Sequence, residues 1–190
     1  KAVNEQFDQH KPNLLRRTLL RQIAFQIGQG VSYSELATNL NVNKKTVMRY
    51  LGLLEKSYVV FSHRGFSRNL RKEYTKSPRY YFWDNGIRNS LISNYNGLNV
   101  RDDVGKLWEN FCVTERTKYL KYKQIPANKF FWRTYEKKEI DLIEECGGKL
   151  YAFECKYSKK NIKAPKDFVS SYPNSNFSVI NKDNYLDYLA

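Results

Sequence analysis

The sequence predicts a mixed α/β (α+β) fold, and three observations support this expectation. Apolar residues recur at helical spacing in several long segments, and shorter runs rich in aromatic and β-branched residues have the character of strands. Hydrophobic residues make up 41% of the chain and aromatic residues 15%, which is more than a disordered chain carries. The 190 residues suffice for two small domains, so we predict domains 1–98 and 99–190, which meet in the Asn-, Gly- and Ser-rich stretch 94–103.

The N-terminal domain begins with three predicted helices. The first follows the apolar pattern from Leu14 to Ile27 and stops at the glycines that come next. A short second helix opens at Ser34, and Asn43 can cap a third helix that runs to Leu54. The stretches 58–61 and 79–83 are then predicted as paired strands around a basic loop, with the aromatic residues 80–83 in the core.

Two helices joined by a short turn and followed by this strand pair form the pattern of a winged helix-turn-helix. In such folds the exposed first positions of the recognition helix meet base edges and phosphates. The candidate nucleic-acid-binding residues are Lys44, Lys45, Thr46 and Arg49 on that helix, and Arg64, Arg68, Arg71 and Lys72 in the wing. Winged helices also serve as packing and oligomerisation modules, so docking to protein is the alternative.

The charge of the chain favours a polyanionic partner. The net charge is +14, and residues 1–100 hold 16 Lys and Arg against 6 Asp and Glu. A phosphate backbone is the commonest polyanion in the cytosol, so DNA is the expected partner. An acidic protein partner or solubility alone also accounts for a basic surface.

The C-terminal domain is predicted to alternate helices and strands. A helix over 105–122 offers Glu109 near its start, and strands are expected around 131–133, 139–143, 152–156 and 178–180. Arg133 lies on the first of these strands and is a candidate phosphate contact. Gly147 and Gly148 supply a turn between the second and third strands, which therefore pair antiparallel.

This pairing gathers acidic and basic groups on one strand pair. Because residues two apart share a face of a strand, Glu154 and Lys156 point together, and Phe153 and Cys155 point the other way. Antiparallel pairing places Asp141 beside Glu154, while Ile140 and Leu142 are expected to form the apolar face of their strand. Two carboxylates suit a hard divalent cation, and a neighbouring ammonium can orient water or offset phosphate charge.

These residues carry a family resemblance. Asp141, Glu154-Cys155-Lys156 and Glu109 resemble the PD-(D/E)XK nuclease superfamily, with Ile140 where a proline usually stands. Together with the runs 105–111 and 131–133, they resemble the C-terminal region of certain archaeal and bacterial AAA-type ATPases, over roughly Leu14 to Ala190. That domain of unknown function pairs a winged helix with a nuclease-like fold.

The resemblance implies a restriction-endonuclease-like mixed sheet flanked by helices. It implies catalytic roles for Asp141, Glu154, Lys156 and Glu109, and Mg²⁺ or Mn²⁺ held by Asp141, Glu154 and Glu109. The implied activity is metal-dependent hydrolysis of DNA; the alternative is a DNA-binding or docking module that retains the fold without the chemistry. Without the resemblance, charged residues on a strand are usually a solvated face, and an acid in a first helical turn is favoured by the helix dipole alone.

Other chemistries find little support in the sequence. No P-loop motif is present, so we expect ATP to bind in an upstream AAA-type domain of the same native chain, and the absence of a starting methionine agrees with a fragment. His10 and His63 are far apart and expected on the surface, and the cysteines lack metal or redox spacing and are expected to be reduced. No apolar run approaches the roughly 20 residues of a membrane span, so no membrane partner and a cytoplasmic location are expected. The oligomeric state is left open.

Overall fold

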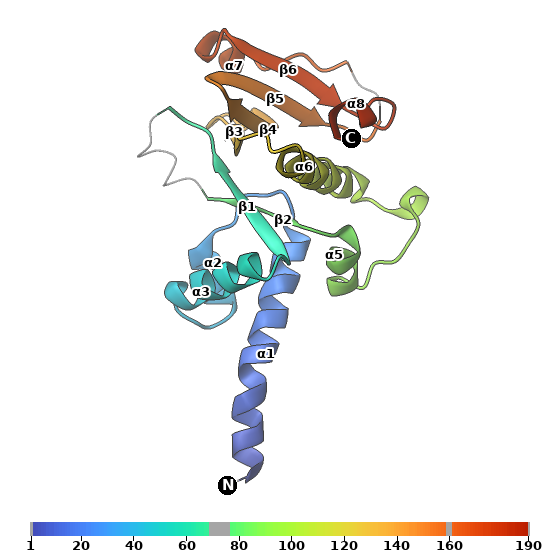
Figure 1. Cartoon of the computed structure of the whole chain (residues 1–190). Coiled ribbons are helices and arrows are strands. Elements are labelled where there is room, and N and C mark those ends of the chain that lie inside the picture. The colour runs from blue at the N-terminus through green and yellow to red at the C-terminus, as the bar shows by residue number, and fades with distance from the viewer. Residues whose placement is uncertain (1, 69–76, 159–160, 190) are drawn as a thin grey trace.

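The computed structural model describes residues 2–68, 77–158 and 161–189, and only the backbone of residues 2–12. It confirms the expected mixed α/β class. A six-stranded mixed sheet runs through the described part of the molecule in the order β2-β1-β3-β4-β5-β6 (Figure 1). The strands are β1 (Val60–Gly65), β2 (Arg79–Phe82), β3 (Asn128–Arg133), β4 (Glu139–Cys146), β5 (Lys149–Cys155) and β6 (Ser175–Ile180).

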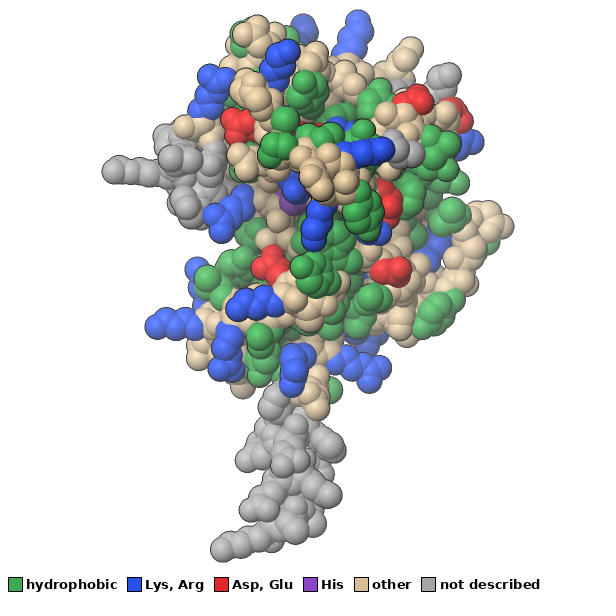
Figure 2. All heavy atoms as spheres, viewed as in Figure 1, with side chains coloured by type: hydrophobic (Ala, Val, Ile, Leu, Met, Phe, Trp, Pro, Cys, Tyr) green, Lys and Arg blue, Asp and Glu red, His purple; other side chains and the backbone are tan. Residues whose placement is uncertain are grey.

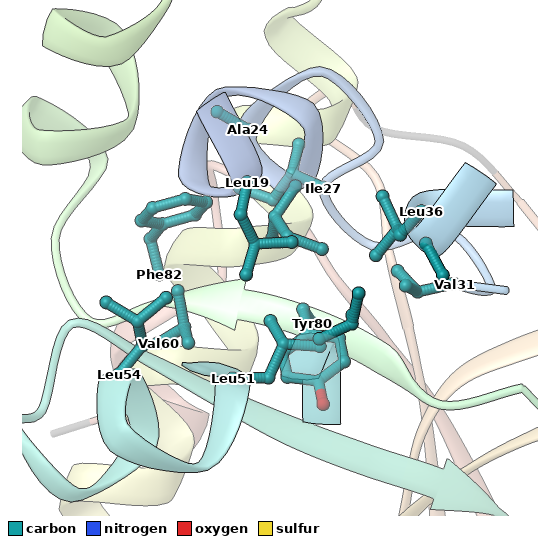
Figure 3. Close-up of a cluster of buried hydrophobic side chains, with 13 residues drawn as sticks. Leu19, Ala24, Ile27, Val31, Leu36, Leu51, Leu54, Val60, Tyr80 and Phe82 are labelled. Atoms are coloured by element: carbon teal, nitrogen blue, oxygen red, sulfur yellow. The ribbon is translucent and has the colours of Figure 1, made fainter. Parts of the chain in front are cut away.

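The three predicted N-terminal helices are present as α1 (Ala2–Phe25), α2 (Tyr33–Asn39) and α3 (Lys44–Lys56). The side chains of Ser32 and Asn43 cap α2 and α3, because each accepts a hydrogen bond from an N–H in the first turn. Figure 3 shows how the three helices and the first two strands share one apolar core, in which Leu19, Leu51, Val60, Tyr80 and Phe82 are among the buried side chains.

The strand predicted over 58–61 begins later, at Val60, and reaches Gly65. Tyr58 has a φ of 56°, in the left-handed region, and its side chain is 65% exposed. The residue therefore belongs to the turn after α3 and cannot continue an extended strand. Of the aromatic residues 80–83 that were predicted to form core, residues 80–82 are buried, whereas Trp83 is half-buried.

Strand β1 joins the N-terminal helices to the rest of the sheet. It pairs antiparallel with β2 on one side and parallel with β3 on the other. The parallel contact includes the pair Arg64 and Phe130, and it is extended by a 2.6 Å hydrogen bond from the N–H of Phe66 to the carbonyl of Phe131. Residues before and after 98 thus contribute strands to the same sheet.

The remaining helices are α5 (Asn85–Leu91), α6 (Val104–Tyr122), α7 (Lys166–Ser171) and α8 (Leu186–Leu189), with a 3₁₀ turn at Leu98–Val100. Helix α6 crosses one face of the sheet and contacts β2, β4 and β5 (Figure 1). Its Asn110 side chain binds both the N–H and the carbonyl of Phe82, at 2.8 and 2.9 Å, and so fixes α6 against β2. No described helix combines the length and the apolar character that a bilayer span requires.

The prediction that both histidines lie on the surface is wrong for His63. This residue is 3% exposed on β1, against the rings of Phe61 and Tyr81, and burial lowers its pKa to about 3. His63 lies inward because it shares a face of β1 with Phe61, two residues away, and packs beside Tyr81 of the neighbouring strand. The side chain of His10 lies outside the described residues. Cys112, Cys146 and Cys155 are free thiols, as expected.

Candidate active site

The predicted acidic residues converge from three elements of the sheet and its covering helix. Asp141 lies on β4, Glu154 on β5 and Glu109 near the start of α6. Their side chains are 9%, 13% and 17% exposed, so all three carboxyl groups are largely withdrawn from water. The Oδ2 atom of Asp141 accepts a hydrogen bond from the N–H of Cys155 at 2.8 Å, which ties β4 to β5 at this point.

Lys156 follows β5 directly and completes the predicted set. Its Nζ donates to Oε1 of Glu154 at 2.6 Å, so the two side chains share a face as the strand spacing predicts. Burial lowers the pKa of Lys156, but the hydrogen bond with Glu154 and the negative charge of Asp141 raise that pKa by more. The ammonium is therefore charged where it faces the acids.

A β-bulge sets the direction of the Asp141 side chain. Trp132 pairs with Ile140 and Phe130 pairs with Ile143, so Asp141 and its neighbour on β4 together face a single residue of β3. The expectation that Ile140 and Leu142 share one apolar face is therefore wrong. Ile140 packs in the cluster that contains Phe168 of α7, whereas Leu142 packs in the cluster that contains Cys112 of α6.

Arg79 supplies a cation that the sequence analysis did not assign to the site. From β2, its Nη1 lies 3.8 Å from Oε1 of Glu109 and 3.9 Å from Oδ1 of Asp141, and its Nη2 bonds to Glu139. The guanidinium also lies over the ring of Phe131, 4.4 Å from its centroid. One buried arginine thus contacts acids of α6 and β4 at once.

The charged neighbours keep this arginine ionised. Burial lowers the pKa of Arg79, but Tyr81, Glu109 and Glu139 raise that pKa by more. Tyr81 lies two residues further along β2, on the same face as Arg79, and its hydroxyl donates to Oε1 of Glu109 at 2.9 Å. The guanidinium of Arg79 and the hydroxyl of Tyr81, both from β2, therefore hold the Glu109 carboxylate in place.

The acids themselves have raised pKa values. Burial raises the pKa of Glu109 to about 8, and the negative charge of Asp141 adds to the shift, while Arg79 opposes it. Burial likewise raises the pKa of Asp141, against the effects of Lys156 and Arg79. Burial and the charge of Asp141 raise the pKa of Glu154. Desolvated, mutually repelling carboxylates of this kind are stabilised by an added cation.

The chemistry of the donors suits Mg²⁺ or Mn²⁺. Within the described ranges, no group of three or more His, Cys, Asp or Glu side chains is arranged to hold a metal ion. Mg²⁺ needs only one or two protein carboxylates and keeps several waters. Asp141 and Glu154 are two carboxylates that offer hard oxygen donors, and Glu109 lies beside Asp141.

A cavity of about 440 Å³ lies beside the acids; Glu109 lines it, whereas Asp141 and Glu154 do not. It lies between the turn that follows α1 and the edge formed by β2, β3 and β4. Its lining includes Gly28, Gly30, Arg79, Lys106, Glu109, Arg133 and Glu139. Gly28 has a φ of 71°, and a side-chain carbon there would come within 2.8 Å of the Glu109 carboxylate, so glycine leaves this wall open.

The predicted DNA-contacting residues of α3 lie at the surface. Lys44, Lys45 and Arg49 are exposed, and Figure 2 shows Lys and Arg side chains around the helical part of the molecule near α1–α3. The Thr46 hydroxyl donates to Oδ1 of Asn43 at 3.0 Å and so contributes to the helix cap.

Two of the predicted wing residues, Arg64 and Arg68, lie in the part of the chain that approaches the C-terminal half. Arg64 is exposed on β1, and Arg68 lies over the ring of Tyr172, 5.5 Å from its centroid. Arg71 and Lys72 lie outside the described residues.

Sequence reasoning missed Arg79, Tyr81, Glu139 and Lys106 as parts of this site. The sequence contained a signal for Arg79 and Tyr81. A charged residue at the start of a strongly aromatic strand needs a partner if that strand is buried, and so does the hydroxyl of a buried tyrosine. Glu139 and Lys106 carry no comparable signal. A charged residue at a strand start or in a first helical turn is ordinarily exposed.

The fold and the acid cluster define a mixed α/β protein with a buried, oxygen-rich charged site at one end of β4 and β5. The chain belongs to the family described as Domain of unknown function (DUF8612), whose model matches residues 4–102. Residues 104–188 match a second family model, Domain of unknown function (DUF4143).

Two curated relatives are longer proteins. Uncharacterized protein Rv2008c of Mycobacterium tuberculosis is 31% identical over 147 residues, which cover 76% of this chain and 32% of the relative. Uncharacterized protein Mb2031c of Mycobacterium bovis gives the same identity and coverage. The chain thus spans about a third of the length of these relatives. No solved structure matches it significantly.

Proposed function

We propose that this protein is the DNA-associated C-terminal region of a AAA-type ATPase and hydrolyses phosphodiester bonds in DNA with Mg²⁺ or Mn²⁺. The observation that carries the proposal is the convergence of Asp141, Glu154 and Lys156 on adjacent strands, with Glu109 beside Asp141. These residues match the motif of the PD-(D/E)XK nucleases, and the β-bulge on β4 sets the direction of the Asp141 side chain. The DUF4143 family is commonly found with AAA-type ATPases, which supports the wider context.

Each residue has a role that follows from its surroundings. Asp141 and Glu154 would hold the cation, with Glu109 assisting, because they are the buried carboxylates of the cluster. A divalent cation held there supplies Lewis-acid stabilisation of the charge that develops on the phosphate. Lys156 is charged and donates to Glu154, so its ammonium is positioned to orient the attacking water and to offset phosphate charge.

DNA would be held by the N-terminal half in this proposal. The fold of α2, α3, β1 and β2 supports a winged helix-turn-helix, because Asn43 caps the start of α3 and Lys44, Lys45 and Arg49 are exposed near that start. Lys106 and Arg133 line the cavity beside the acids and would contact the phosphate backbone there.

A second candidate is a DNA-binding or docking module that keeps the fold without cleavage. Two observations favour it. Arg79 already supplies a positive charge to Glu109, Asp141 and Glu139, where a metal would otherwise do so. In addition, Met48 and Leu53 on α3 are 49% and 48% exposed, which is more typical of a protein contact than of a phosphate contact.

Cleavage of a supercoiled plasmid and of a linear duplex with an unpaired tail, each with Mg²⁺ or Mn²⁺ and with EDTA, separates the two candidates. The nuclease proposal expects cleavage only with metal, and Lys156→Ala should lower turnover at least about 100-fold. Calorimetric titration of Mn²⁺ should give nearly unchanged affinity in Lys156→Ala and a lost signal in Asp141→Asn. Lys149→Ala, an exposed lysine at the start of the same strand, is the matched control and should cleave as the wild type does. Metal binding without cleavage in the wild type would favour the non-catalytic candidate.

A further inference from the structure

A second cavity extends the one that reaches the acids. It also measures about 440 Å³, and Gly30 and Arg133 line both cavities, so the two are adjacent and are together called the groove. Phe131, Tyr135 and Lys137 line its outer part. The groove thus extends from Glu109 and Glu139 in the first cavity to Tyr135 and Lys137 in the second, at the turn between β3 and β4.

The turn that forms the outer end of the groove is braced. The N–H of Thr134 donates to the carbonyl of Lys138 at 2.9 Å, and the N–H of Lys138 donates back to the Thr134 hydroxyl at 3.2 Å. The Lys138 ammonium also lies 2.6 Å from Oδ2 of Asp167 on α7. These bonds hold the tip of the turn, where the Tyr135 side chain is 100% exposed. Glu136, which pairs with Lys138 at 3.0 Å, and then Lys137 follow Tyr135.

The chemistry of this groove matches one class of ligand. Basic side chains that follow a groove attract a phosphate backbone, and an exposed aromatic ring offers a stacking surface to a base. A base inside a duplex already has a neighbour on each of its faces. A lone tyrosine in a groove can therefore stack on an unpaired base, whereas a paired terminal base would first have to leave its partner to enter the groove.

We propose that the groove between the Gly28–Gly30 turn and the β3–β4 turn binds single-stranded DNA, with Tyr135 stacking on an unpaired base and Arg133 and Lys137 along its phosphates. This inference rests on the proposed function and names its substrate: DNA with an unpaired tail. Glu109 and Arg79 line the first cavity, and Arg79 lies 3.9 Å from Oδ1 of Asp141, so a strand bound there passes close to the acids.

The test is fluorescence anisotropy of the full chain in EDTA with three labelled DNAs: a blunt duplex, the same duplex with a thymidine tail, and the free tail strand. Tyr135→Ala should weaken binding of the tailed and single-stranded DNAs by about 5- to 100-fold and leave the blunt duplex unchanged. Tyr135→Phe keeps the ring and should bind as the wild type does. Tyr95→Ala removes a ring that is 75% exposed elsewhere and serves as the control.

Three results would overturn the inference: unchanged binding of the tailed DNA by Tyr135→Ala, an equal loss on the blunt duplex, or an equal loss in Tyr135→Phe. Because the measurement contains no metal, its outcome is independent of cleavage. A loss of binding in Tyr135→Ala, in a protein that never nicks DNA, would support the single-strand groove and refute the nuclease proposal. Nicking of the blunt duplex, with unchanged DNA binding in Tyr135→Ala, would support the nuclease proposal and refute the single-strand groove.

Discussion

The buried carboxyl of Glu109 should make the protein less stable as the pH rises. Its pKa is about 8 in the folded protein against an ordinary value of 4.5, so between these values the folded state holds a proton that the unfolded chain has lost. The free energy of unfolding falls with pH wherever the folded state binds more protons. Between pH 5.5 and 7.5, Glu109 alone should account for a loss of about 2.5 kcal/mol.

Urea denaturation in EDTA at a series of pH values measures this effect. Glu109→Gln cannot ionise, so its free energy of unfolding should fall by about 2.5 kcal/mol less than that of the wild type over the same interval. Glu136→Gln changes a side chain that is 75% exposed and should follow the wild-type curve. Parallel curves for Glu109→Gln and the wild type would refute the reasoning, since they would mean that Glu109 ionises as easily in the folded protein as in the unfolded chain.

Three further predictions concern the cations of the molecule. Mn²⁺ at about 100 times its dissociation constant should stabilise the wild type by about 2.7 kcal/mol, seen as a higher melting temperature, and Asp141→Asn should abolish the rise. Arg79→Met should lower the free energy of unfolding at pH 8 by about 3–5 kcal/mol, because the substitution leaves buried acids unpaired. The loss should be smaller at pH 5.5, where these acids bind protons, and equal losses at both pH values would contradict the prediction. Replacing Lys45 and Arg49 by Ala should reduce the salt dependence of duplex binding by about two units of slope, measured by titration at several salt concentrations; an unchanged slope would point to protein docking.

Several elements of this fold were accessible from local sequence signals, whereas α7 and α8 were not predicted. Asn43 marks the start of α3, and the glycine pair at 147–148 marks the turn between β4 and β5, because each relies on contacts within a few residues. The pairing of Glu154 with Lys156 followed from strand alternation alone. Local rules of this kind do not depend on the rest of the chain.

The other features depend on contacts between distant segments. The bulge at Asp141 arises from the register between β3 and β4, which strand alternation does not encode. The place of Arg79 in the acid cluster requires β2 to lie near β4 through the intervening strands β1 and β3. His63 is buried for the same reason, since β1 has a neighbouring strand on both sides. Such long-range pairings were outside the reach of the sequence pattern.

The parallel contact between β1 and β3 places the junction of the two matched families inside a single sheet. Neither region is then a self-sufficient unit: separated near residue 103, each would present an unpaired strand edge of the kind that invites aggregation. The charged site is divided in the same way, with Arg79 and Tyr81 contributed by the first region and Glu109 and Asp141 by the second. A chimera that exchanged one region for a distant relative's would have to restore both the strand register between β1 and β3 and the charge balance around Arg79.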